Sequence, residues 1–100
     1  MLLLIPMDSD DVQEAQITTV SDVKTWAQLL IESGQVVEIL HSQTYDGFPK
    51  WSECAVVSSD AESVMDFLNM SMMVLVAHTQ KNIDDIVEAY LFRELHDLAY

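Results

Sequence analysis

Histidine and cysteine are the residue types in this sequence that can bind a soft or borderline metal. The candidates are His41, Cys54, His78 and His96, and no pair has the close spacing of a structural zinc site. We expect His41 to end one strand and His78 to follow another, and α/β sheets bind ligands beyond the carboxyl ends of their strands. The sequence therefore predicts a ligand site at His41, Cys54 and His78. The alternative is two exposed loop histidines and a buried core thiol.

Catalytic chemistry has little support. Asp8 and Asp60 are expected to follow two strands, where carboxylates can hold the divalent ions of a nuclease, but no third carboxylate is placed beside them. Roles in loops and helix caps account for both residues. Two glycines cannot supply a nucleophile elbow, a phosphate-binding loop or a dinucleotide fingerprint. We therefore predict a protein that is not an enzyme.

Large aromatic residues are the second candidate for function. Tyr45, Phe48 and Trp51 fall in an irregular segment, and Trp26 falls in an apolar run. Aromatic side chains in such places either plug the core or anchor a protein partner. These four residues are the predicted interaction residues.

The charge excludes several classes of function. Seventeen acidic residues against four basic ones give a net charge of −13, which repels nucleic acids and anionic membrane surfaces. A single cysteine cannot form an internal disulfide, so we expect a cytoplasmic protein. The apolar start, residues 1–5, lacks the basic residues and the length of a signal peptide. One hundred residues predict a single domain, 1–100.

Two kinds of strand are predicted. Short apolar runs typical of strands covered on both faces occupy residues 2–7, 54–58 and 72–77. Two further runs, 24–32 and 35–42, surround Ser33 and Gly34, which predicts an antiparallel hairpin. The apolar spacing of residues 22–32 also fits a helix, and this alternative stays open.

Two helices are predicted in the second half of the chain. Ser59 and Asp60 can cap one that begins near Ala61. Asn82 can cap the other, whose apolar residues recur at spacings of three and four through Leu95 and Leu98. Residues 41–53 carry turn residues and are too short for a long loop and a full helix.

The order of these elements predicts an α/β fold. An antiparallel three-strand meander is followed by strand–helix–strand–helix, which gives a mixed five-stranded sheet of ribonuclease H-like architecture. The helix of the crossover between the third and fourth strands is shortened or absent. One face of the sheet would then be thinly covered, and an uncovered apolar face is usually buried in a partner or a second copy. A homodimer is therefore expected.

Several strings resemble the dinitrogenase iron–molybdenum cofactor biosynthesis family, whose members carry the nitrogenase cofactor or its precursor. The most similar is the segment 83–91, Ile-Asp-Asp-Ile-Val-Glu-Ala-Tyr-Leu, with Glu94 and Leu95 after it. Residues 4–8, 24–34 and 36–38 resemble the family's first three strands. The resemblance implies an iron–sulfur or iron–molybdenum type cluster as cargo.

Two departures from the family pattern bear on function. Residues 21–24 stand where the family has Ser-x-His-Phe-Gly, and residues 41–53 are too short for its glycine-rich loop and helix. Because the residues most plausibly tied to cargo are missing, the sequence favours a non-enzymatic, carrier-like domain that acts through protein contacts. The alternative is a true cluster binder that uses the histidine and cysteine ligands named above.

Overall fold

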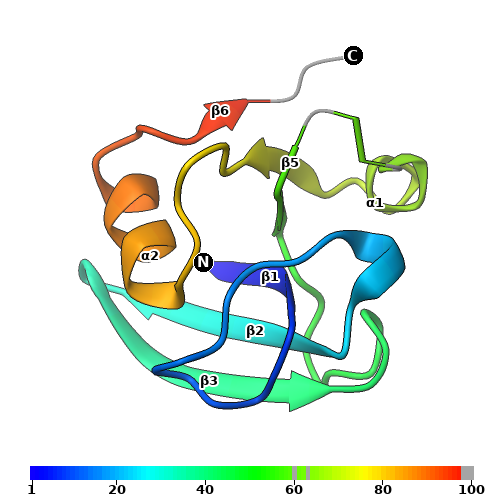
Figure 1. Ribbon diagram of the computed structural model, residues 1–100, viewed down its shortest axis with the longest axis horizontal. Helices are drawn as coiled ribbons and strands as arrows, with labels where there is room; N and C mark the ends of the chain where they lie inside the picture. The colour runs from blue at the N-terminus through cyan, green and yellow to red at the C-terminus, as the bar shows by residue number, and fades with distance from the viewer. Residues whose placement is uncertain (60, 63, 98–100) are drawn as a thin grey trace.

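The computed structural model describes residues 1–59, 61–62 and 64–97. In these residues a mixed six-stranded sheet is combined with two α-helices (Figure 1). The strands are β1 (Leu2–Met7), β2 (Thr25–Glu32), β3 (Gln35–Ser42), β4 (Cys54–Val57), β5 (Met73–Val76) and β6 (His96–Asp97). Their order across the sheet is β3-β2-β1-β4-β5-β6. Asp60 and Leu98, which were assigned to a cap and a helix end, lie outside the described residues.

The strand directions follow from the connections. β1, β4 and β5 are parallel neighbours, whereas β2 is antiparallel to both β1 and β3. The β2–β3 turn places Ser33 at φ 54° and Gly34 at φ 76°. Two successive left-handed residues form the tight turn whose twist matches that of a hairpin. The predicted hairpin is confirmed, and residues 25–32 are a strand rather than a helix. A short 3-10 helix, η1 (Val20–Asp22), precedes it.

The sequence predicted a shortened or absent helix in the crossover from β3 to β4, and residues 43–53, all of which are described, contain none. A buried amide fastens this segment to the sheet. Gln28 Nε2 donates to the carbonyl oxygen of Lys50 at 2.9 Å and to Ser52 Oγ at 2.8 Å. Because an unpaired buried amide is costly, these bonds fix the crossover over β2 without the help of a helix.

Each face of the sheet has its own core. Helix α2 (Ile83–Leu91) buries Ile83, Ile86 and Ala89 against one face. The opposite face carries α1 (Met65–Asn69), together with η1 and the crossover. Figure 1 shows the two helices at opposite sides of the molecule. The second face is therefore covered mostly by irregular chain.

The last helix is shorter than predicted. It ends at Leu91, and Arg93 takes a left-handed φ of 58°. The amide of Glu94 donates to the Ala89 carbonyl oxygen at 2.7 Å, and the amide of Arg93 donates to that of Tyr90 at 3.2 Å. These two bonds form a Schellman motif, which ends a helix. The chain then extends into β6, so the sheet has six strands rather than the expected five.

We expect Arg93→Gly to be more stable than Arg93→Ala by about 1 kcal/mol, because only glycine adopts a left-handed φ without a steric cost. The comparison with alanine cancels the loss of the arginine side chain. Thermal unfolding checks this, since about 1 kcal/mol corresponds to roughly 4–8 °C in a domain of this size. Equal melting temperatures would contradict the left-handed assignment.

Candidate functional site

The two histidines expected to share a rim lie far apart on it. β3 and β5 run in the same direction, so His41 at the end of β3 and His78 after β5 do face the same edge. However, β2, β1 and β4 lie between them. Four interstrand steps of about 4.8 Å separate the two strands by roughly 19 Å. One metal ion or small cluster cannot bind both side chains.

Cys54 lies at the amino end of β4, whereas the two histidines lie at the carboxyl ends of β3 and β5. It begins β4, is 1% exposed and pairs with Leu3 and Met73. Burial, and then the nearby charges of Asp97 and Glu53, raise the pKa of its thiol to about 12 from an ordinary 9.0. The thiolate is the form that ligates metals and attacks substrates. Cys54 is therefore a protonated core thiol at neutral pH.

His41 is half-buried on β3, and its Nε2 atom is enclosed without a hydrogen-bond partner among the described residues. Asp8, considered as a nuclease carboxylate, instead accepts a hydrogen bond from the Gln16 amide at 2.8 Å and so closes its own loop. Across the described ranges, no group of three or more His, Cys, Asp or Glu side chains could hold a metal ion. The predicted ligands thus form no common site.

A pair of histidines that was not predicted does come together. The rings of His78 and His96 have centroids 5.7 Å apart and are tilted by 31°. His96 belongs to β6, where it pairs with Val76 of β5. The sequence offered His96 as a ligand but placed it inside a long helix, so its closeness to His78 could not be inferred. A glycine after Leu91 would have been the usual signal of an earlier helix end.

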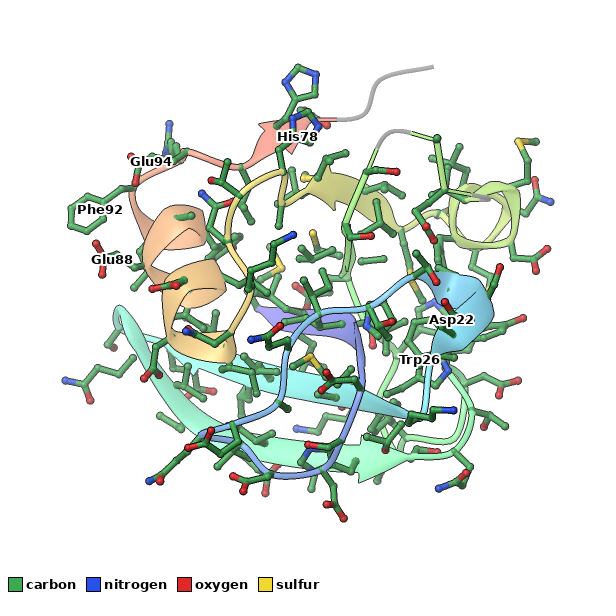
Figure 2. The ribbon with its side chains drawn as sticks, viewed as in Figure 1. Asp22, Trp26, His78, Glu88, Phe92 and Glu94 are labelled. Atoms are coloured by element: carbon green, nitrogen blue, oxygen red, sulfur yellow. The ribbon has the colours of Figure 1, made fainter. Side chains whose placement is uncertain are left out.

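Three of the four predicted interaction aromatics pack inside the fold. Trp26 is 4% exposed and makes edge-to-face contacts with Tyr45 and Phe67, at centroid distances of 5.9 Å each. Tyr45 and Phe48 are half-buried against the same core. These rings belong to the core on the α1 face of the sheet, where they contribute to packing. Figure 2 shows Trp26 on the sheet close to η1.

Trp51 is the exception. Its side chain is 56% exposed, and its Nε1 donates weakly to the Met70 carbonyl oxygen at 3.5 Å. Met73, three residues after Met70, is 51% exposed, and its amide donates to the carbonyl oxygen of Glu53. Trp51 is therefore bonded to the backbone of the turn that follows α1, and Met73 begins the strand that follows this turn. We call Trp51, Met70 and Met73 the Trp51 surface.

A hollow of about 270 Å³ begins at Met73, between β5, β6 and the end of α2. Its lining is Met73, Leu75, Tyr90, Arg93, Leu95 and Asp97. Burial, followed by the charges of Cys54 and Glu53, raises the pKa of Tyr90. Its lining combines apolar side chains with the phenol of Tyr90, the guanidinium of Arg93 and the carboxylate of Asp97. Those groups suit a partner side chain with both apolar and polar parts.

A second hollow, of about 250 Å³, lies along α2. Its lining includes Asp85, Glu88 and Glu94, so it is acidic and open to solvent. Figure 2 shows Glu88 and Glu94 near the outer side of α2, with Phe92 pointing away from the molecule. Phe92 is 71% exposed and Leu91 beside it is 40% exposed, next to these acidic residues. A small exposed apolar group of this kind is common and needs no partner.

No helix within residues 1–59, 61–62 and 64–97 is long and apolar enough to cross a membrane.

Comparisons with known proteins relate the chain to others by fold. No protein-family model matches the sequence, and no curated protein does. Among solved structures, PH0822 superimposes with a TM-score of 0.73 at 14% identity, over 97% of this chain and 96% of that one. A Methanocaldococcus jannaschii protein named "putative dinitrogenase" gives a TM-score of 0.71 at 14% identity, over 99% and 95% of the two chains. At this identity the likeness shows a shared mixed α/β fold.

Proposed function

We propose that this protein is a non-enzymatic, carrier-like domain that acts by self-association through the Trp51 surface. The observation that carries the proposal is the exposure of the apolar side chains of Trp51 and Met73, the second of which lines the hollow at β5. Exposed tryptophan is enriched among residues that dominate protein–protein binding energy. A twofold dimer would place the Trp51 surface of each copy against the same surface of the other.

The kinship of the fold supports the carrier-like part of the proposal. The antiparallel β1–β2–β3 meander followed by the parallel strands β4 and β5 agrees with the elements predicted from the sequence, and a ribonuclease H-like sheet is part of the proposal. The protein named "putative dinitrogenase" has this overall fold, and the sequence resembles nitrogenase cofactor carriers. Because His41, Cys54 and His78 lie apart, we propose the scaffold of a carrier without the iron–sulfur or iron–molybdenum cluster as cargo. A cytoplasmic location and the absence of nucleic-acid binding belong to the same proposal.

The free edge at β3 is the less suitable surface for self-association. β3 pairs only with β2 among the described strands, but its register shifts opposite Leu30 and Ile31. The strand also carries the exposed carboxylate of Glu38. A bulge and a charge are two features that keep edge strands from pairing with one another. The three residues of the Trp51 surface are uncharged, and they lie before β4 and before or at the start of β5 rather than on the β3 edge.

We expect Trp51→Ala to raise the dimer dissociation constant at least tenfold, because it removes the largest exposed side chain of the Trp51 surface. Light scattering coupled to size-exclusion chromatography, over a range of concentrations, measures the change. The wild-type mass should approach about twice the 11.3 kDa of one chain as concentration rises. The matched control is Phe92→Ala, another exposed aromatic, which should dimerise like the wild type.

The dependence of the dimer on salt concentration is a second test of self-association. Two copies carrying −13 each repel one another, and added salt screens this repulsion. The dimer should therefore tighten when sodium chloride rises from about 0.01 M to about 0.15 M, over which the screening length falls from about 30 to 8 Å. A wild-type protein that stays monomeric at every concentration and salt level would overturn the proposal.

A further inference from the structure

We infer that His78 and His96 together form a binding site for one divalent transition-metal ion of the borderline class, such as Zn²⁺ or Ni²⁺. Neutral imidazole is a preferred ligand of these ions. The inference is independent of self-association, because the two rings lie at the carboxyl end of β5 and the Trp51 surface lies at its start.

Hydrogen bonds and strand pairing hold the backbone at or directly beside both histidines. The Ala77 amide donates to the Val57 carbonyl oxygen at 2.8 Å, which fixes the backbone directly before His78. His96 is held by its pairing with Val76 across the β5–β6 ladder. Figure 2 places His78 beside β6. Both side chains are exposed, so their rings can rotate toward a common ion while the backbone stays in place.

The ring separation matches that of two imidazoles bound to one ion. A metal–nitrogen bond of about 2.0–2.1 Å puts the ion about 3.2 Å from a ring centroid. Two rings on the same ion then have centroids about 4.5 Å apart at a right angle and about 6.4 Å apart when they are opposite. The 5.7 Å between His78 and His96 lies inside this range.

Water would complete the coordination. The described residues provide no third His, Cys, Asp or Glu side chain grouped with this pair. A two-ligand, solvent-exposed site exchanges its ion readily, which suits reversible binding better than structural stabilisation. The net charge of −13 attracts cations of every kind, so selectivity is what distinguishes the pair. Mg²⁺ and Ca²⁺ prefer oxygen ligands and should not compete.

The chain offers a direct test because it contains three histidines in all. Tag-free, full-length protein is titrated with Ni²⁺, and the ring proton signals of the histidines are followed by NMR. We expect the signals of His78 and His96 to broaden together at the same low concentration of Ni²⁺, while those of His41 persist. An excess of Mg²⁺ should change nothing.

Single variants give the matched measurement. His78→Ala and His96→Ala should each weaken Zn²⁺ binding at least tenfold in calorimetry, and His41→Ala should bind like the wild type. Since His78 and His96 are exposed, neither change is expected to unfold the protein, and circular dichroism verifies this. Broadening of His78 and His96 at different Ni²⁺ concentrations, or wild-type affinity in either variant, would overturn the inference in favour of two rings that merely stack.

Discussion

Replacing Trp26 with alanine is expected to lower the free energy of unfolding by about 3–5 kcal/mol, the usual cost of removing a large aromatic ring from a core. Trp26 is 4% exposed and contacts Tyr45 and Phe67 edge to face. Those two rings also meet each other at 5.7 Å, so the substitution removes two of the three contacts in a closed set. Because small domains have modest stability, the variant should be largely unfolded near physiological temperature.

Trp51→Ala is the matched control for this loss, measured at a concentration where the protein is monomeric. It should change the free energy of unfolding by no more than about 0.5 kcal/mol, as is usual for exposed positions. The chain has two tryptophans, so each variant leaves one as a fluorescent reporter. In Trp51→Ala, emission from Trp26 should be blue-shifted while the protein is folded and should move to longer wavelength on unfolding. Similar destabilisation by both variants would contradict the assignment of one ring to the core and the other to the surface.

Cys54 is expected to react with a thiol reagent at neutral pH about a thousandfold more slowly in the folded protein than in the unfolded chain. The rise in pKa from 9.0 to about 12 lowers the thiolate fraction by this factor, before any effect of steric protection. The measurement is the rate of labelling by a chromogenic disulfide, with and without denaturant. Rapid labelling of the folded protein would restore Cys54 as a candidate ligand or nucleophile.

The same shift predicts a loss of stability in alkali. Above pH 9 the unfolded chain releases the thiol proton, while the folded protein keeps it until about pH 12. The unfolded state then binds fewer protons, so stability falls as pH rises. The contribution is fully present below pH 9 and is lost as pH approaches 12. Cys54→Ala should lose less stability than the wild type between pH 9 and pH 10.5.

The strands were predicted well because their signals are local. Residues 2–7 were expected as a strand and β1 spans Leu2–Met7; the runs 24–32 and 35–42 became β2 and β3. Continuous apolar runs report burial on both faces, and the glycine after Ser33 reports the turn. Helix ends were predicted less well. α1 begins at Met65 rather than near Ala61, and α2 ends at Leu91 although apolar residues continue at helical spacing.

The candidate site was predicted less well than the fold. Each ligand was placed at a strand end from its own neighbours, and those placements were reasonable. What failed was the assumption that ends on one rim are close, because the hairpin puts β3 at one edge of the sheet and the later strands build out the other. The pair His78 and His96 depends on β6, a strand of two residues whose pattern is too short to be seen in the sequence.

Local patterns along the chain predicted the kind of protein: an acidic α/β fold, the order of its first five strands along the chain, and a crossover too short for a full helix. Apolar periodicity and turn residues act over a few positions, so they can be read without coordinates. Only the tertiary structure decided which aromatic ring is buried, which thiol is protonated and which two histidines meet. Those properties depend on contacts between residues far apart in the chain. The meeting of the two histidines, for example, follows from a left-handed Arg93, after which the last segment runs back along β5.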